Sequence, residues 1–226
     1  MSLPKRALIE RRPWLLASLI AGISYYFVKD AALAGLFKMA WKGAGVALLA
    51  AYAFRHAPGR DGKMLATVMA FGALGDMAIE ISLEAGAACF FVGHLIAIAL
   101  YAGHRRTSLT SSQKAAALAL LLGTPLIAFL LPTDRSAAPG VALYALALGG
   151  MAAAAWSSAF PRYRVGLGAA LFVASDLLIF SRMGPLAASP LPELLIWPLY
   201  YAGQLLICLG VVSCLRKRGE SVITNV

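Results

Sequence analysis

The sequence contains unusually little charge. Asp, Glu, Lys and Arg make up 13% of its 226 residues, hydrophobic residues make up 61%, and the mean hydropathy is +0.78. A soluble domain is about 25% charged and about 45–50% apolar. This chain has too few polar side chains to cover a folded surface in water. The composition therefore excludes a soluble globular protein and predicts an integral membrane protein.

The motifs of soluble enzymes and of metal proteins are also missing. The sequence has no G-x-S-x-G, no H-E-x-x-H, no P-loop and no dinucleotide fingerprint. Its three cysteines (Cys89, Cys208 and Cys214) lie in or at the end of apolar segments, without a CxxC pair, and we assign them no role. Because His94 is the one histidine inside an apolar segment, we expect neither a metal nor a cofactor.

Negative charge is scarcer than positive charge, and the net charge is +10. The cations occur in short clusters between long apolar runs rather than on one continuous face. That placement is what anionic lipid headgroups and membrane topology require. We therefore expect membrane lipid, and not nucleic acid, as the partner of these clusters.

Eight apolar segments reach or approach the roughly 20 residues that a membrane-spanning helix needs. They run over about residues 13–28, 31–54, 64–83, 85–103, 115–131, 139–159, 164–181 and 194–215. No convincing small-residue cleavage site follows the first segment, so it is interpreted as a retained helix and not as a signal peptide. Pro125 predicts a kink in the fifth. The prediction is an all-α polytopic bundle, a single domain over residues 1–226.

The loops support this count independently. If the N-terminus is cytoplasmic, the inner ends hold fifteen Lys and Arg residues, and the outer loops hold only Lys29, Arg135 and Arg182. The inner residues are Lys5, Arg6, Arg11, Arg12, Arg55, Arg60, Lys63, Arg105, Arg106, Lys114, Arg162, Arg164, Arg216, Lys217 and Arg218. Such asymmetry favours eight spans with both termini in the cytoplasm. Minimal loops and Ala-rich helices are typical of a bacterial inner-membrane protein.

Ionisable and polar side chains inside the predicted spans are the candidate site. A charge at the centre of a membrane helix costs about 2.5–3.5 kcal/mol on insertion scales, so each one needs a reason. Residues four apart share a helix face, and three such pairs occur here. The set comprises Lys38 and Lys42, Asp76 and Glu80, Tyr200 and Gln204, together with His94, Asp176 and Tyr201. Most of these residues lie in the middle or outer half of their helices, so we expect them to converge on one polar cavity.

Structural ion pairs are the simpler interpretation. Lys42 with Asp76, or Lys38 with Glu80, would neutralise both partners, and Tyr200 and Tyr201 could belong to an interfacial aromatic belt. Two lysines do not, however, need two aspartates, a glutamate and a histidine. Two nearby buried carboxyls favour a state in which one is protonated and the other ionised. That state suits a general acid/base pair and equally a proton-coupled carrier, and spacing does not separate the two.

Two short segments suggest an internal duplication. Phe71-Gly-Ala-Leu-Gly-Asp76 in the third span and Leu171-Phe-Val-Ala-Ser-Asp176 in the seventh each place a small residue before an aspartate. They occupy corresponding places in two four-helix halves. A parallel repeat of the halves would explain the match, as in some other membrane folds.

Four short motifs, in this order, resemble the YhhN-like lysoplasmalogenases, a family of eight-helix membrane proteins. They are Gly75-Asp76, Gly93-His94 followed by Tyr101, Ser175-Asp176, and Tyr200-Tyr-Ala-Gly-Gln204. The resemblance extends over nearly the whole chain. The family's Lys-Pro near the start of the second helix has no counterpart, since Lys38 precedes Met39 and Lys42 precedes Gly43. The resemblance therefore does not decide which lysine corresponds, and it does not extend to Glu80.

The resemblance implies hydrolysis of the vinyl-ether bond of a lysoplasmalogen to a fatty aldehyde and glycerophosphocholine or -ethanolamine. For this reaction we assign Asp76 and Asp176 as the acid/base pair, with either one as the proton donor. Lys42 or Lys38 would hold an aspartate ionised or bind the substrate phosphate. His94, Tyr200 and Gln204 would orient water and the carboxylates. The outward bias of the polar groups predicts lipid access from the non-cytoplasmic side.

Three other interpretations use the same residues. A proton- or ion-coupled carrier would use the carboxylates and lysines as a relay, with broken helices. A non-catalytic scaffold would use the charges as structural pairs. A related enzyme would act on another ether or lysolipid. The headgroup preference and the oligomeric state stay open.

Overall fold

The computed structural model describes residues 12–224, with side chains to residue 218. This part of the chain is helical, and its one β contact is an isolated bridge between Arg105 and Ser158. The predicted all-α class is therefore confirmed. Lys5, Arg6 and Arg11 of the first basic cluster lie outside the described residues.

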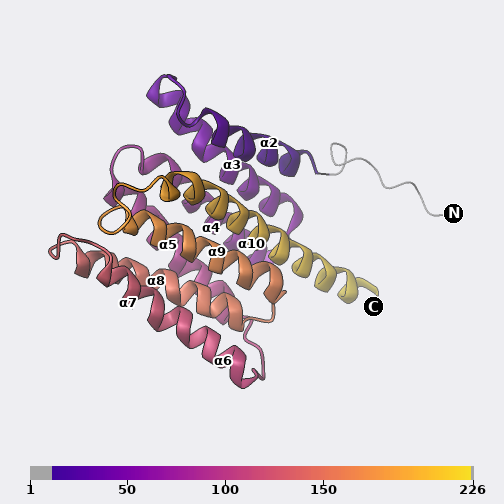
Figure 1. The fold of residues 1–226 in the computed structure, drawn as a ribbon. Coiled ribbons are helices and arrows are strands. Elements are labelled where there is room, and N and C mark those ends of the chain that lie inside the picture. Colours follow the sequence, from indigo (N-terminus) through magenta and orange to yellow (C-terminus); the bar gives the residue numbers. More distant parts are fainter. Residues whose placement is uncertain (1–11, 225–226) are drawn as a thin grey trace.

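Eight helical rods correspond one to one with the eight predicted segments (Figure 1). The first four rods are α2 (Pro13–Val28), α3 (Gly35–His56), α4 (Gly59–Ala78) and α5 (Leu83–Ala102). The fifth combines α6 (Ser111–Leu118), the π-helical η1 (Ala119–Gly123) and α7 (Thr124–Leu130). The last three are α8 (Ala138–Ser157), the π-helical η2 (Arg162–Gly166) leading into α9 (Leu167–Ser181), and α10 (Leu191–Thr224).

Five of these rods are long and apolar enough to cross a membrane. They are Leu83–Ala102, Ser111–Leu130, Ala138–Ser157, Arg162–Ser181 and Leu191–Arg218, and α2 is a shorter apolar helix of 16 residues. This finding supports a multi-pass membrane protein. Eight crossings, cytoplasmic termini and the internal repeat remain predictions.

Local sequence signals explain several helix ends. The Ser82 hydroxyl accepts a hydrogen bond from the Ala85 N–H and so caps α5. Thr110 and Gln113 form a reciprocal capping box at the start of α6. Pro125 cannot donate a backbone hydrogen bond, and the π-helical turn of η1 directly precedes it. The irregularity predicted in the fifth span is therefore a π-turn inside a continuous rod.

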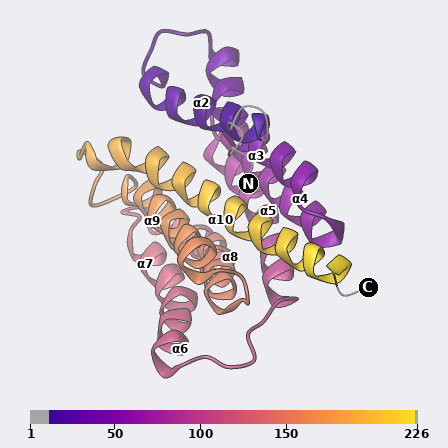
Figure 2. The same cartoon turned by 90° about the vertical axis from the view of Figure 1, so that its right-hand side faces the viewer.

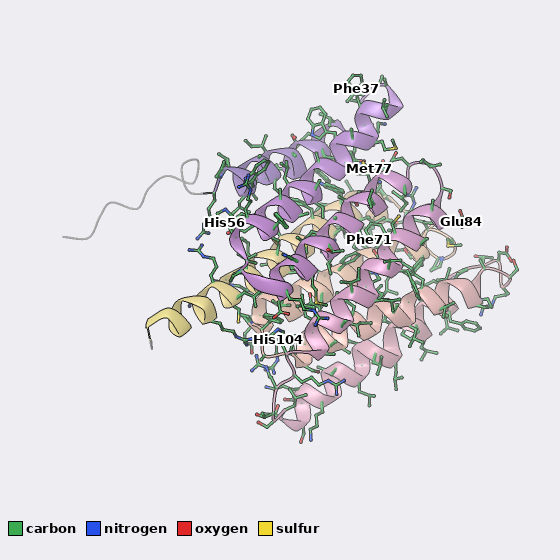
Figure 3. All side chains as sticks on the ribbon, turned by 180° about the vertical axis from the view of Figure 1, so that it is seen from behind. Phe37, His56, Phe71, Met77, Glu84 and His104 are labelled. Atoms are coloured by element: carbon green, nitrogen blue, oxygen red, sulfur yellow. The ribbon has the colours of Figure 1, made fainter. Side chains whose placement is uncertain are left out.

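Successive helices run up and down, and α10 packs across both halves of the bundle (Figures 1 and 2). It contacts α9 most extensively and also touches α2, α3 and α4, while α5 and α8 join the halves. We call the end where α2 begins and α3 terminates the termini end, and the opposite end the far end. His56 and His104 lie towards the termini end, and Glu84 lies towards the far end (Figure 3).

Close backbone packing holds α10 against its neighbours. A Cβ atom added at Gly168 on α9 would lie 2.7 Å from the Gly203 carbonyl oxygen on α10. A Cβ added at Gly22 on α2 would lie 2.3 Å from the Tyr201 ring. Small residues at these positions let the backbones approach closely, which is how membrane helices gain packing energy. This packing fixes the position of the polar side chains on α10.

Candidate active site

Asp76 is the centre of the first polar cluster. It lies two residues before the end of α4, and only 3% of its surface is exposed. The Tyr200 hydroxyl on α10 donates a hydrogen bond to Asp76 Oδ2 over 2.9 Å. Gln204, one turn further along α10, donates from Nε2 to that hydroxyl oxygen over 3.3 Å. The Tyr200–Gln204 pair predicted from the sequence therefore faces Asp76.

Asp176 on α9 is the centre of a second cluster built in the same way, and it is 4% exposed. The Tyr144 hydroxyl on α8 donates to Asp176 Oδ2 over 2.6 Å. His94 Nε2 on α5 lies 3.2 Å from the same hydroxyl oxygen. Since the tyrosine proton is directed to Asp176, His94 donates its Nε2–H in this arrangement. The result is a continuous chain of hydrogen bonds from His94 to the carboxylate.

Aromatic rings join the two clusters. The Phe172 ring on α9 makes edge-to-face contacts with Tyr200 and with His94, each at 5.1 Å between ring centroids. The Phe90 ring on α5 packs edge-on against Phe172 at 5.8 Å and Tyr200 at 5.7 Å. The two carboxyls therefore belong to one site with an apolar, aromatic wall.

Glycines on α4 make room for this arrangement. A Cβ atom at Gly72 would lie 2.9 Å from Gln204 Nε2, and one at Gly75 would lie 2.7 Å from the Phe90 ring. On α9, the Ser175 hydroxyl donates to the Ile196 carbonyl oxygen of α10 over 3.0 Å. The small residue before each aspartate thus has a local reason: Gly75 admits a ring, and Ser175 ties α9 to α10.

Lys42 and Glu80 form an ion pair at the far end of the bundle, with 2.5 Å between Nζ and Oε1. The side chains are 18% and 33% exposed. This contact corrects both pairs considered from the sequence, which joined Lys42 to Asp76 and Lys38 to Glu80. It also corrects the placement of Glu80 on the face of a helix with Asp76, since α4 ends at Ala78 and Glu80 lies in the following turn. Lys42 still interacts electrostatically with Asp76.

A groove of about 300 Å³ opens at the far end, next to this ion pair. Its wall carries cations, carboxylates and aromatic rings, namely Tyr25, Lys29, Asp30, Lys38, Lys42, Glu80, Arg182, Glu193 and Trp197, with Pro192 and Ile196. The Trp197 ring packs against Tyr200, with 5.7 Å between centroids. Two aromatic side chains, Trp197 in the groove wall and Tyr200 behind it, therefore connect the groove to Asp76.

The predicted site residues thus divide into two groups. Those buried in the interior around the two carboxyls are Asp76, Asp176, His94, Tyr200 and Gln204, and those lining the groove are Lys38, Lys42 and Glu80. Tyr201 belongs to neither, because its hydroxyl shares a hydrogen bond with Ser18 on α2. Within residues 12–224 no group of three His, Cys, Asp or Glu side chains is arranged to hold a metal ion.

Tyr144 is a candidate site residue that the sequence interpretation does not include. It was overlooked because it stands alone in the sixth span, without an ionisable residue or a polar i,i+4 partner. Its hydroxyl nevertheless joins His94 to Asp176. A buried tyrosine needs a partner for its hydroxyl group, and that requirement was the available signal.

An all-helical chain with five long apolar helices and an interior carboxylate site is a multi-pass membrane protein. The model of the YhhN family matches residues 37–211, well over half of the chain, and the protein belongs to this family. The matched range contains every site residue predicted from the sequence. Comparison with curated proteins and with solved structures finds no significant match for the chain.

Proposed function

We propose that this YhhN family member hydrolyses the vinyl-ether bond of lysoplasmalogens by general acid/base catalysis at Asp76 and Asp176. The observation that carries the proposal is the pair of buried carboxyls, each hydrogen-bonded by a tyrosine, on one aromatic wall. A structural ion pair needs a cation for each acid. The hydrogen-bonding partners of these two acids are instead the neutral side chains Tyr200 and Tyr144.

The reaction requires a proton donor and an ionised base, and two carboxyl groups in different protonation states can supply both. Proton donation to the vinyl carbon remote from oxygen leaves an oxocarbenium ion at the carbon bonded to oxygen. Water adds to that carbon while a base takes its proton. The resulting hemiacetal then loses its hydroxyl proton and releases the glycerol oxygen as an alcohol, which gives the aldehyde. A proton donor, an anion beside the cation and a base for water suffice.

We assign Asp176 as the proton donor and Asp76 as the anion and base. Burial disfavours the charged form of both carboxyls, and the charge of Lys42 offsets part of that cost at Asp76. The hydrogen-bonding partner of Asp176 is the neutral Tyr144, which is itself bonded by His94. A histidine can return a proton to Asp176 through the tyrosine hydroxyl, whereas the Gln204 amide beside Tyr200 has no such capacity.

The far-end groove supplies a place for the polar part of the substrate. A lysoplasmalogen headgroup carries a phosphate and an ammonium group. The groove offers Lys38 and Lys42 to the first and carboxylates to the second, such as Glu193. The vinyl ether lies just beyond the glycerol, so a seated headgroup would direct it past Trp197 towards Asp76. Displacement of the Trp197 ring would open that route.

The decisive experiment incubates the purified full chain with lysoplasmenylcholine and traps the fatty aldehyde. Acyl lysophosphatidylcholine and the saturated alkyl-ether analogue serve as substrate controls, because neither has a double bond that can accept the proton. We expect aldehyde from the vinyl ether alone. Asp76→Asn and Asp176→Asn should each lower kcat by about 10²- to 10⁴-fold, the usual contribution of a general acid or base.

Asp134→Asn is the matched control, because Asp134 is exposed in a loop and its carboxylate is hydrogen-bonded by Ser136 in the same loop. It should keep full turnover. Full turnover in folded Asp76→Asn and Asp176→Asn would refute the assignment of the acid/base pair. If the folded wild-type protein releases no aldehyde, the hydrolase is refuted, and uptake into proteoliposomes under a proton gradient then tests the carrier.

A further inference from the structure

A second cavity, larger than the far-end groove, lies at the termini end. It encloses about 630 Å³ and its wall carries four cations: Arg12, Arg164, Arg216 and Lys217. The buried Tyr52 ring and three aliphatic side chains of α10 complete most of the wall. Among the described residues that line it there is no carboxylate.

An adjoining cavity of about 520 Å³ continues this basic surface. It shares Arg164, Ser213 and Lys217 with the first and adds Arg218, whose guanidinium donates to His104 Nδ1 over 2.9 Å. The described lining residues of this cavity also include no Asp or Glu. Arg164 and Lys217 line both cavities, so a branched headgroup that reaches into both would contact the same two cations.

The cations come from separate parts of the chain. Arg12 precedes α2, Arg164 lies in η2, and Arg216 lies on α10, yet all three line one cavity. The charges of Arg12 and Arg216 both act on Tyr52 and on the His56 ring. Because like charges repel, the convergence of Arg12, Arg164 and Lys217 around one hollow favours an anionic occupant. Charges that serve topology alone have no need of a shared cavity.

The apolar part of the wall identifies the kind of anion. Leu206, Leu209 and Val212 form a strip along α10 that leads from the cations towards the middle of the bundle. A free phosphate ion would not use that strip, whereas the glycerol and first acyl carbons of a phospholipid would lie along it. Basic pockets between membrane helices are known to bind lipid headgroups in this way.

We propose that these two cavities at the termini end, around Arg164 and Lys217, bind the headgroup of an anionic phospholipid. The site is separate from the carboxylate site and does not rest on the proposed hydrolase activity. A diphosphate headgroup places one phosphate in each cavity, and a monophosphate headgroup occupies the larger one.

Native mass spectrometry of the detergent-solubilised full chain tests this proposal. Cardiolipin, phosphatidylglycerol and phosphatidylcholine are added in turn, and inorganic phosphate and glycerol phosphate are added as soluble competitors. We expect the anionic lipids to remain bound and phosphatidylcholine to dissociate. Arg164→Gln/Lys217→Gln should weaken binding of the anionic lipids about tenfold or more, because each cation near an anionic headgroup contributes measurably to affinity.

The matched control is Arg60→Gln/Lys63→Gln, which removes the same charge from exposed residues at the same end that line neither cavity. It should bind anionic lipid as the wild type does. Equal loss in both double variants, or equal retention of phosphatidylcholine, would overturn the site. Displacement of the lipid by soluble phosphate would overturn the lipid as its ligand. If the double variant does not fold, Lys217→Gln is compared with Lys63→Gln.

Discussion

The two ends of this bundle differ in the charged side chains that line their cavities. At the far end, cations and carboxylates share one groove, and Lys42 and Glu80 pair directly. At the termini end, two adjoining cavities collect cations, and no carboxylate is among their described lining residues. A mixed wall suits a zwitterionic headgroup that enters and leaves, whereas a purely basic wall suits an anionic lipid that stays.

The two buried carboxyls lie in the interior of the bundle, closer to its far end than to its termini end. Asp76 is in the last turn of α4, at its far end, and Trp197 and Tyr200 connect it to the groove. The nearest counterpart at the termini end is a surface network, in which Asp61 and Arg218 both bond His104. Under the two proposals made above, polar contacts near the far end serve chemistry and those at the termini end serve anchoring.

Among three comparisons of one end of the bundle with the other, the largest effect is expected from Tyr144→Phe. Loss of the hydroxyl removes the hydrogen bond to Asp176 and separates His94 from the carboxylate. Once Asp176 has donated its proton, this hydrogen bond is made to a charged carboxylate and contributes about 1.5–3 kcal/mol, so kcat should fall roughly ten- to hundredfold. The counterpart at the termini end is Tyr163→Phe, in a side chain that is 82% exposed. That variant should keep the wild-type kcat. If kcat fell equally in Tyr144→Phe and Tyr163→Phe, the hydroxyl of Tyr144 would have no special role in the reaction.

A smaller effect, on stability, is expected from Gly75→Ala. The new methyl group would lie 2.7 Å from the Phe90 ring inside the packed interior. Overpacking of this kind costs about 1–3 kcal/mol, so the Tm should fall. At the termini end, a Cβ at Gly103 would come no closer than 3.5 Å to the Leu100 carbonyl oxygen. Gly103→Ala should leave the Tm unchanged, and a fall as large as that of Gly75→Ala would contradict tight packing around the site.

The smallest effect is expected from the Lys42–Glu80 ion pair. A double-mutant cycle with Lys42→Gln and Glu80→Gln should give a coupling free energy below about 1 kcal/mol, since both side chains are partly exposed. The His104–Asp61 contact at the termini end has similar exposure, 19% and 36%, and is the comparison pair. Both coupling free energies are measured by thermal unfolding. A value of several kcal/mol for Lys42–Glu80, without a similar value for His104–Asp61, would show that the Lys42–Glu80 pair stabilises the fold.

The number and order of the helices could be predicted because hydropathy is a local property. Each apolar run must lie in lipid or in the core, so a sequence window finds it wherever it packs. The predicted first span, 13–28, coincides with α2, while the third, 64–83, is displaced towards its C-terminus relative to Gly59–Ala78. Because the predicted span extends beyond Ala78, where α4 ends, it wrongly placed Glu80 on the helix.

The site residues could be predicted where burial made a polar group expensive. Asp76, Asp176 and His94 were recognised because an ionisable side chain in an apolar run needs a purpose. Their partners could not be predicted, because Tyr200 reaches Asp76 across 124 positions of sequence and Tyr144 reaches Asp176 from another helix. No spacing rule within one helix extends across such distances.

The sequence by itself determined the class of protein, the helical rods, the family and the short set of polar residues in the interior. Those properties depend on composition, on local periodicity and on short motifs, all of which can be recognised in the sequence alone. Only the tertiary structure decided which tyrosine serves which aspartate, that Lys42 pairs with Glu80, and that cations from residues 12, 164 and 216–217 line one cavity. The physical reason is that these contacts depend on the rotation and depth of each helix against its neighbours. Close packing at glycines and across the whole bundle sets that rotation and depth, and no single segment does.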